Sequence, residues 1–376
     1  MEPDKIYLDF NASTPIAAEV AAAMECYLRA AYGNPSSGHW AGRPAREAVE
    51  LARSQVAALL QADPGEIVFT SGGSESNNLA IKGMFFAAAA GSRAHIVTTT
   101  VEHPATLAPC RFIERLGASL TVLPVDEYGR VDPDDVRRAL TPETRLISIM
   151  HANNEVGTIQ PVAEIGRIAR EHGVPLHVDA AQSVGKIPVH VDELGADLLS
   201  VAGHKMYAPK GIGALYVRKG VRLEPLIHGA GHEGGRRAGT ESALLATGLG
   251  AASELVRDLR PMENVRALRD RLWQGLQERW GDRVVLNGHP VERLPNTLNA
   301  SFVGRRAGDL LARLDDVALS AGSACHAGAI DLSPVLKAMG VLPDIGMGAI
   351  RFSLGRSTGA AEIETLLGRL EQALMP

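Results

Sequence analysis

Between residues 65 and 250 the sequence alternates short, nearly continuous apolar segments with stretches of helical character. The seven apolar segments are EIVFTS (66–71), AHIVTTT (94–100), SLTVLPV (119–125), RLISIMHA (145–152), VPLHVDA (174–180), ADLLSVAG (196–203) and GALYVRKG (213–220). Apolar strands that alternate with helices are typical of a largely parallel sheet covered on both faces. The sequence therefore predicts an α/β fold built on a mainly parallel seven-stranded sheet.

The character of the sequence changes after about residue 252. A long amphipathic segment at 253–281 is interrupted by Pro261, and short strand-like and helix-like segments follow before a final helix from Ala360. A chain of 376 residues is also long for one hydrophobic core. We therefore expect a second, smaller α+β domain. The predicted boundaries are 15–252 for the large domain, and 1–14 with 253–376 for the small domain.

Composition excludes several classes of protein. The net charge is −5, with no long run of one sign, so no broad basic face for nucleic acid is expected. The longest apolar stretches, such as 84–91, are too short to span a bilayer, and the first ten residues lack the pattern of a signal peptide. We expect a cytoplasmic protein that contacts neither nucleic acid nor a membrane directly.

The three cysteines are spaced too sparsely for a disulfide framework, and no Cys/His spacing indicates a metal site. Cys26 and Cys110 lie in apolar helical patterns, so we expect both to be small buried apolar residues. Cys325 lies in the segment SAGSACHAGAIDLSP (320–334), which is rich in small residues. A thiol on a mobile, exposed loop is a candidate nucleophile, although a lone cysteine is more often a small buried apolar residue.

Polar side chains follow five of the predicted strands, at the point where each strand ends. They are Ser71 to Asn78, His103, Asn154, Asp179 with Gln182, and His204 with Lys205. Ligands of parallel sheets collect at the carboxyl ends of the strands. The sequence therefore predicts one site at this edge, built from all five segments.

Lys205 is the residue of this group that is hardest to explain as structural. Burying an ammonium at the end of an apolar strand is costly, and a lysine that forms an imine escapes that cost. We interpret Lys205 as a Schiff-base lysine for pyridoxal phosphate, with His204 beside the phosphate. Asp179 either caps the following helix or keeps the pyridine nitrogen protonated. His103 is either a core histidine or a residue that stacks on the ring.

Nine motifs, taken together and in this order, resemble those of the cysteine desulfurases of the nitrogen-fixation and iron–sulfur-assembly type. The motifs are LDFNASTP, GNPSSGH, FTSGGSESNNLAIKG, EHPA, SIMHANNEVGTIQP, HVDAAQSVGK, GHKMYAPKGIGALYV, RRAGTE and SAGSAC. These enzymes are fold-type I pyridoxal-phosphate enzymes related to class V aminotransferases. The resemblance covers essentially the whole chain, and it implies the fold-type I transferase architecture.

The resemblance implies roles for five residues around the cofactor ring. Lys205 would hold the cofactor as a Schiff base, and Asp179 would pair with the pyridinium nitrogen. Gln182 would face the phenolic oxygen of the ring. His103 would stack on the ring and assist proton transfer, and Asn154 would approach the ring oxygen and the substrate.

It also implies how the phosphate and the substrate are held. Gly73, Ser74 and His204 would hold the phosphate, and Thr240 would reach the phosphate of a neighbouring subunit, which implies a homodimer with shared active sites. Arg351 would clamp the substrate carboxylate through a planar fork of two hydrogen bonds. The chain departs from the family at Ala202, where a serine is often found, so one hydroxyl to the phosphate is missing.

The implied reaction converts L-cysteine to L-alanine. The substrate amine displaces Lys205, Lys205 removes the α-proton, and the Cys325 thiolate takes the sulfur as an enzyme persulfide that passes to an acceptor protein. His326, directly after the cysteine, leaves a selenocysteine lyase as an alternative, because a selenol leaves without attack by a thiolate. An idle sulfur-assembly scaffold and a transaminase-like enzyme with a passive Cys325 are further alternatives.

Overall fold

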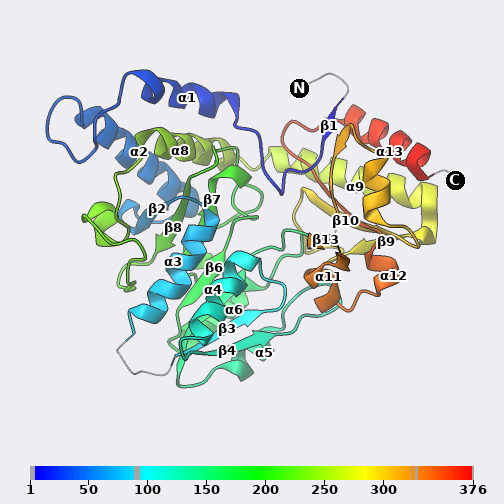
Figure 1. Ribbon diagram of the computed structural model, residues 1–376, viewed down its shortest axis with the longest axis horizontal. Coiled ribbons are helices and arrows are strands. Elements are labelled where there is room, and N and C mark those ends of the chain that lie inside the picture. The colour runs from blue at the N-terminus through cyan, green and yellow to red at the C-terminus, as the bar shows by residue number, and fades with distance from the viewer. Residues whose placement is uncertain (1–4, 89–93, 322, 327–328, 375–376) are drawn as a thin grey trace.

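The computed structural model describes residues 5–88, 94–321, 323–326 and 329–374, and for 323–326 and 329–331 only the backbone. A seven-stranded sheet in the order β2-β8-β7-β6-β5-β3-β4 forms its centre (Figure 1). The strands are β2 (Ile67–Thr70), β3 (His95–Thr99), β4 (Ser119–Leu123), β5 (Thr144–Met150), β6 (Leu176–Asp179), β7 (Leu198–Ala202) and β8 (Gly213–Val217). Only β8 runs antiparallel to its two neighbours in this sheet. The predicted mainly parallel seven-stranded sheet is therefore confirmed.

Alternate residues of most strands in this sheet enter different apolar cores, which explains why these strands read as continuous apolar runs. Leu146 and Leu198 pack with α3 (Gly73–Phe86) and α4 (Pro104–Glu114) on one face. Ile147 on the other face packs with a larger set of helices. These helices are α1 (Ala18–Arg29), α2 (Arg43–Leu60), α6 (Val162–Glu171) and α8 (Ala243–Arg257). Helices thus cover both faces of the sheet and leave its carboxyl edge open.

A second sheet has four strands in the order β12-β15-β10-β9 and its own apolar core. The strands are β9 (Val284–Asn287), β10 (Thr297–Phe302), β12 (Ser320–Ala321) and β15 (Ala349–Ser353). The helices α9 (Pro261–Trp280), α10 (Ala307–Ala312) and α13 (Ala360–Leu374) contribute to this core. The predicted long helix around Pro261 is two helices, α8 and α9, because this proline occupies the first turn of α9 and starts it.

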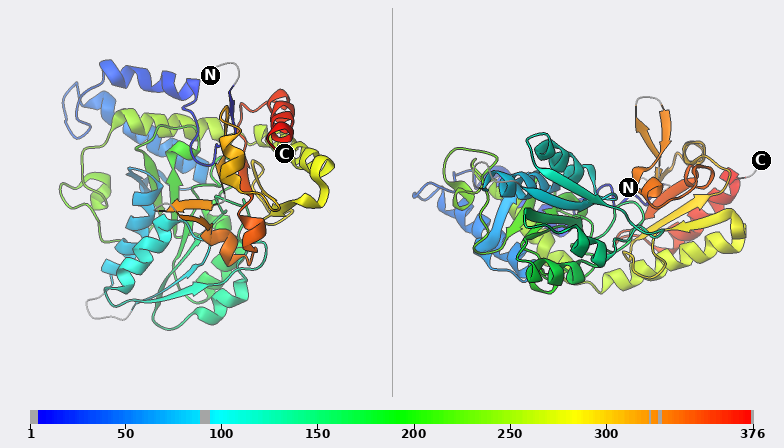
Figure 2. Two further views of the ribbon diagram at one scale, coloured as in Figure 1. Left: turned by 45° about the vertical axis from the view of Figure 1, so that its right-hand side comes forward. Right: turned by 90° about the horizontal axis from the view of Figure 1, so that it is seen from below.

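The N-terminal strand joins the second sheet region rather than the first. β1 (Ile6–Tyr7) pairs in parallel with β11 (Val317–Ala318), and the chain then crosses to α1 at the far side of the molecule (Figures 1 and 2). The segment between them passes the carboxyl edge of the large sheet. Residues 5–15 therefore reach both sheets.

The remaining elements are short. The helices are α5 (Pro133–Ala139), α7 (Val191–Leu194), α11 (Pro334–Ala338) and α12 (Pro343–Gly346). The strands β13 (Ser323–His326) and β14 (Ala329–Leu332) pair as an antiparallel hairpin, where the sequence predicted a loop. Across the described ranges, each helix is too short or too polar to cross a bilayer.

The two cysteines outside this hairpin differ in environment. Cys110 is fully buried between α4 and the sheet, as predicted, and burial raises the pKa of its thiol to about 12. The prediction that Cys26 is buried is wrong, because its side chain is exposed. On α1 the buried side chains are Val20 and Met24, which lie four residues apart on one face. Cys26, two positions after Met24, faces away from that stripe.

Candidate active site

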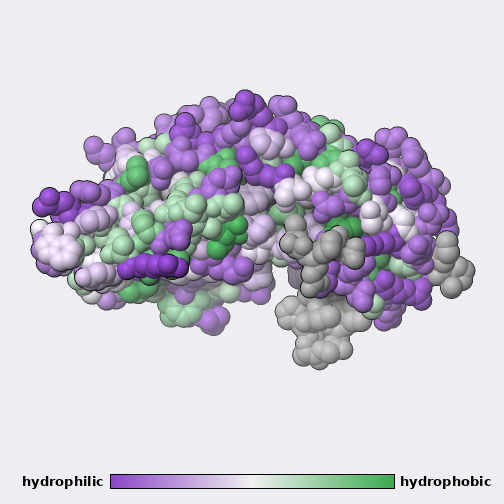
Figure 3. Space-filling model, turned by 90° about the horizontal axis from the view of Figure 1, so that it is seen from above, coloured by the Kyte–Doolittle hydropathy of each residue, from purple (hydrophilic) through white to green (hydrophobic). Residues whose placement is uncertain are grey.

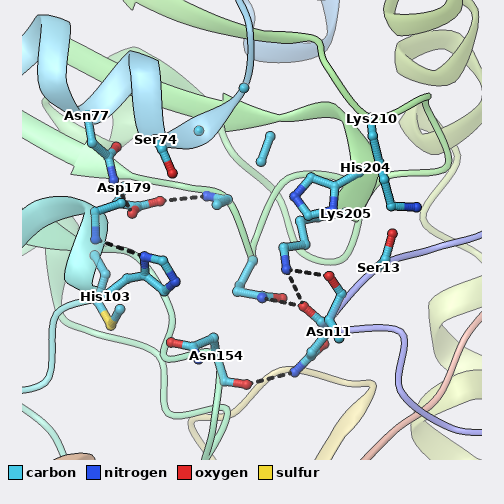
Figure 4. Close-up of a pocket in the computed structure, with 18 of the residues that line it drawn as sticks. Asn11, Ser13, Ser74, Asn77, His103, Asn154, Asp179, His204, Lys205 and Lys210 are labelled. Carbon is cyan, nitrogen blue, oxygen red and sulfur yellow. Dashed lines mark hydrogen bonds between the residues drawn. The ribbon is translucent and has the colours of Figure 1, made fainter. Parts of the chain in front are cut away.

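A cavity of about 640 Å³ opens at the carboxyl edge of the seven-stranded sheet. Figure 4 shows Asp179 and His103 on one side of the open space, and Lys205 with His204 on the other. Asn154 lies at its lower edge, and Ser74 lies above it. Five segments that end different strands therefore converge on one cavity, as the parallel topology requires.

The turn between β2 and α3 provides a cradle for an anion. Gly72 adopts φ 146° and ψ −178°, a backbone conformation that is essentially restricted to glycine. This turn lets α3 start at Gly73, so the first N–H groups of a fourteen-residue helix face the cavity beside the Ser74 hydroxyl. Glu75 closes the turn from the other side, since its Oε2 accepts the N–H of Ser71 at 2.7 Å.

Asp179 is a buried carboxylate at the end of β6, with 6% of its surface exposed. Its Oδ2 accepts a hydrogen bond from Asn77 Nδ2 at 2.7 Å, and its Oδ1 accepts one from the N–H of Ala181 at 3.0 Å. Two fixed donors hold the carboxylate in one orientation at the cavity. The arrangement suits a carboxylate that faces a cationic ring nitrogen.

Lys205 lies in the short 3-10 helix Gly203–Lys205 that follows β7. Its Nζ donates to the carbonyl oxygens of Asn11 at 2.6 Å and Ala12 at 2.7 Å. Burial and the guanidinium of Arg351 lower the pKa of this amine to about 8, against the opposing effects of Asp9 and Asp179. The amine therefore yields its neutral, nucleophilic form far more readily than an exposed lysine.

His103 begins α4 as its N-cap residue. Its Nδ1 accepts the N–H of Ala105 at 3.0 Å, so the neutral ring carries its proton on Nε2. Desolvation lowers the pKa of the imidazole more than Asp179 raises it, and Lys205 lowers it further. The ring is therefore neutral near pH 7, which suits both stacking on a planar group and proton transfer.

His204 has a buried Nδ1 that contacts no partner among the described residues. Burial and the ammonium groups of Lys205 and Lys210 lower the pKa of this imidazole to about 4. Ala202 lines the same part of the cavity, and a Cβ built on Gly73 would lie 3.2 Å from the Ala202 Cβ. The phosphate cradle is thus narrow here, and a buried nitrogen is left for a ligand.

Gln182 lines the cavity with its carboxamide held from two sides. Its Nε2 donates to the carbonyl oxygen of Asn11 at 3.0 Å, and its Oε1 accepts from Lys186 Nζ at 2.7 Å. The carboxamide has a second N–H group, which neither contact uses. That hydrogen is available to an oxygen acceptor in the cavity.

Arg351 reaches the cavity from β15 of the second sheet. Its Nη2 lies 2.8 Å from Asp9 Oδ1, and its Nη1 donates to the carbonyl oxygen of Asn154 at 3.0 Å. Its buried Nε has no partner among the residues that the structure describes. Nη2 also donates to Ser320 Oγ at 2.9 Å, so the protein holds the guanidinium in place through three N–H groups and leaves the N–H on Nε and one on Nη1 for a carboxylate ligand.

Thr240 lies outside the cavity as the single chain forms it, and Cys325 cannot be placed relative to the cavity because only its backbone is described. Thr240 is exposed and is not among the described residues that line the cavity. Cys325 is placed only by its backbone, opposite Ile330 in the hairpin, and its side chain lies outside the described residues. The side chain of His326 also lies outside them.

The sequence analysis assigned no role to three polar residues at or beside the site. The backbone carbonyl oxygen of Asn11 accepts hydrogen bonds from both Lys205 and Gln182. The side chain of Asn77 donates a hydrogen bond to Asp179. Glu102, buried directly before His103, accepts from the N–H of Met150 at 3.0 Å. The quoted motifs contained all three, but only the folded chain shows what each contacts.

The residues present fit pyridoxal phosphate. The cavity offers a helix N-terminus with Ser74 for the phosphate, and the unpartnered Nδ1 of His204 lies in the same wall. Asp179 and Lys205 occupy opposite sides, which matches a ring nitrogen and a ring aldehyde that also lie on different sides of the cofactor (Figure 4). The donor set therefore matches the group in charge and in chemistry.

Comparisons with known proteins agree with this site. A family model described as Aminotransferase class-V matches residues 6–366. The chain is 47% identical over 374 residues to the cysteine desulfurase IscS of Dictyoglomus turgidum, and the alignment covers 98% of this chain and 94% of that protein.

Among solved structures, one described as a NifS-like protein superposes with a TM-score of 0.92 at 36% identity, covering 98% of this chain and 99% of that chain. Another, described as SspA in complex with cysteine, has a TM-score of 0.84 at 38% identity and covers 93% of this chain and 98% of that chain.

Proposed function

The chain belongs to the aminotransferase class-V family and is a pyridoxal-phosphate-dependent cysteine desulfurase, and on this premise we propose how its own residues carry out the reaction. The observation that carries the proposal is the cavity in which Lys205 and Asp179 face each other across the space for the cofactor. The bound cofactor supplies an electron sink for the carbon atoms of the substrate. Asp179 keeps that sink effective because Asn77 and the N–H of Ala181 hold its carboxylate in place.

Lys205 is the residue that moves protons at the substrate α-carbon. Once its Nζ is free of the cofactor, the carbonyl groups of Asn11 and Ala12 hold it. Its lowered pKa, about 8, gives a substantial neutral fraction near neutrality. His103, neutral and with its proton on Nε2, lies across the cavity as a second proton carrier.

Arg351 and Asn154 position the substrate. The substrate carboxylate binds the guanidinium of Arg351, whose Nε is unused by the described protein groups. The hydrogen bond from Arg351 Nη1 to the carbonyl oxygen of Asn154 couples the two residues. Because Arg351 comes from the second sheet, substrate binding links the two sheets at the cavity.

Cys325 receives the sulfur in this proposal. Its thiolate forms an S–S bond with the substrate sulfur while the carbon–sulfur bond of the substrate breaks. The electron pair of the broken bond stays with the carbon skeleton, which takes up protons and leaves as L-alanine, and the sulfur remains on the enzyme as a persulfide. The hairpin β13–β14 carries Cys325 beyond the four-stranded sheet (Figure 2), and an acceptor protein takes the sulfur there. A covalent persulfide keeps free sulfide out of solution.

We further propose that the enzyme is a homodimer, with Thr240 of each chain at the phosphate of the other. Apolar side chains on α1 and on the segment between α1 and α2 support this: Leu28, Tyr32 and Trp40 are 65%, 79% and 78% exposed in the single chain. Figure 3 shows apolar residues gathered on the half of its face over α1, α2 and α8, whereas the half over α9 and α13 is more hydrophilic. Exposed apolar and aromatic side chains are typical of a protein interface.

The domain boundaries and the compartment belong to the same proposal. The separate apolar cores of the two sheets support a large domain over 15–252 and a small domain of 1–14 and 253–376. A persulfide carrier with only three cysteines suits a reducing compartment, which supports the cytoplasm.

The experiment that tests the sulfur step compares two substrates on one variant. Cys325→Ala should retain the visible absorbance of the bound cofactor and lose alanine formation from L-cysteine by about a hundredfold or more. Turnover of L-selenocysteine should fall far less. Unchanged turnover of L-cysteine by this variant would refute the persulfide role and favour the lyase alternative.

A further inference from the structure

Lys186 is a second buried amine close to the cavity, and the reaction described above does not use it. Only 8% of its surface is exposed. Its Nζ lies 2.7 Å from Gln182 Oε1 and 3.3 Å from Asn11 Oδ1. Burying an amine costs free energy unless its hydrogens are satisfied, so its contacts indicate what it does.

The environment of Lys186 favours an uncharged amine. Burial lowers its pKa well below the usual value, and the cationic groups of Lys205 and Arg351 lower it further. A neutral amine keeps two N–H groups. The two acceptors, on Gln182 and Asn11, match this number, so the amine is satisfied without adding a charge beside Lys205.

The contact with Lys186 fixes which end of the Gln182 carboxamide faces which neighbour. In the observed orientation Oε1 faces the N–H donor of Lys186, and Nε2 faces the carbonyl oxygen of Asn11 at 3.0 Å. Rotating the carboxamide by half a turn would bring Nε2 against a donor and Oε1 against an acceptor. Oε1 would then meet the carbonyl oxygen of Asn11, which is a second acceptor, and the N–H that Lys186 now donates to Oε1 would lose its acceptor in a buried site.

We propose that Lys186 is a positioning residue, which holds the carboxamide of Gln182 so that an N–H group rather than the carbonyl oxygen faces the ring oxygen of the cofactor. The inference rests on the proposed placement of that oxygen next to Gln182. An N–H donated to the oxygen stabilises its anionic form. Lys186 therefore tunes the acid–base behaviour of the bound cofactor without touching it.

The test is a pH titration of the visible cofactor band in purified holoenzyme, with no substrate present. In Gln182→Leu the midpoint should move to higher pH by about one unit, because the anionic oxygen loses one hydrogen bond. Lys186→Met should move it in the same direction by a similar amount. The double variant should move no further than either single variant, because both remove the same contact.

Two further variants make the result decisive. Lys82→Met is the matched control, because Lys82 lies on α3 and packs on the ring of Phe112 in α4. The titration midpoint of this variant should equal that of the wild type. Lys186→Gln keeps an N–H donor and should retain the wild-type midpoint even if Lys186→Met gives little soluble protein. Loss of soluble holoenzyme in both Lys186 variants would show a role in folding alone and would overturn the proposal.

The outcomes also separate this inference from the proposed function. A shift in Gln182→Leu but none in Lys186→Met would overturn the role of Lys186 and leave the placement of the cofactor intact. No shift in Gln182→Leu itself would overturn the placement of the ring oxygen, and with it both statements. Additive shifts in the double variant would show that the two residues act independently, which contradicts the positioning role.

Discussion

The Nζ of Lys205 lies 2.6 Å from the carbonyl oxygen of Asn11, although the two residues are 194 positions apart in the sequence. The same carbonyl oxygen accepts from Gln182 Nε2 at 3.0 Å. The N-terminal segment thus closes one wall of the cavity with backbone acceptors rather than with charges. Asp9 and Asp179 raise the pKa of this amine, but burial and Arg351 outweigh them and lower it to about 8.

The first prediction concerns the pH dependence of cofactor loading. Only the neutral amine of Lys205 attacks an aldehyde, and its pKa in the cofactor-free chain is lowered to about 8. The rate at which the apoprotein gains its visible band with pyridoxal phosphate should rise with pH up to about 8 and then level off. Lys205→Ala should bind the cofactor without forming that band. A rate that keeps rising to pH 10 would contradict the lowered pKa.

Arg351→Lys should weaken substrate binding more than it slows turnover. Lysine keeps the positive charge but cannot form the planar fork that a carboxylate prefers. We expect the KM for L-cysteine to rise roughly ten- to a hundredfold with a smaller change in kcat. Steady-state kinetics measure this, with Arg271→Lys in an exposed ion pair on α9 as the control. An unchanged KM would exclude Arg351 from the carboxylate site.

Glu102 should make the stability of the protein fall as pH rises. Burial raises the pKa of its carboxyl group to about 8, against the hydrogen bonds from Met150 and Thr99. Between the unfolded pKa near 4.5 and about 8, the folded state holds a proton that the unfolded state has lost. The contribution of Glu102 to the free energy of unfolding is therefore fully present below pH 4.5 and is lost as the pH rises to about 8.

Glu102→Gln removes that titration while it keeps an acceptor oxygen for both donors. From pH 5 to 7 the difference between the free energies of unfolding of the variant and the wild type should change in favour of the variant by about 1.4 kcal/mol per pH unit. Urea titrations at several pH values measure the difference, with the exposed Glu254→Gln as the control. A constant difference across this range would mean that Glu102 is ionised in the folded protein.

Arg53→Ala should be strongly destabilising. Its guanidinium donates to both carboxylate oxygens of Glu233, at 2.7 Å and 2.9 Å, and both residues are buried. Removing one partner leaves a buried charge, which costs about 3–5 kcal/mol. Arg257→Ala, in an exposed pair with Glu254, should cost less than about 1 kcal/mol. Equal effects in denaturant titrations would refute the distinction.

Much of the fold could be predicted from the sequence because both faces of the large sheet are covered. Each central strand is then a short apolar run, and the segments 145–152 and 174–180 contain β5 and β6. The sequence predicts one helix interrupted at Pro261, whereas the structure has two helices there. The sequence does not show that α8 starts as early as Ala243. Local patterns indicate where helices exist better than where they begin.

The candidate site was predicted to the extent that topology alone builds it. Strand ends of a parallel sheet meet at one edge, so His103, Asp179 and Lys205 could be grouped before the structure was known. Asn11 could not be grouped with them, because its contact with Lys205 depends on how the N-terminal segment crosses the sheet edge. The exposed Cys26 was missed because apolar neighbours in a helix do not fix which face a residue occupies.

The most direct measurement of the central claim is the location of the sulfur after one turnover. The holoenzyme is incubated with L-cysteine without an acceptor, free thiols and persulfides are alkylated, and the peptides are weighed by mass spectrometry. The peptide that contains Cys325 should gain the mass of one sulfur atom, whereas those with Cys26 and Cys110 should not. Alanine produced with no added sulfur on Cys325, or sulfur found on another cysteine, would contradict the account.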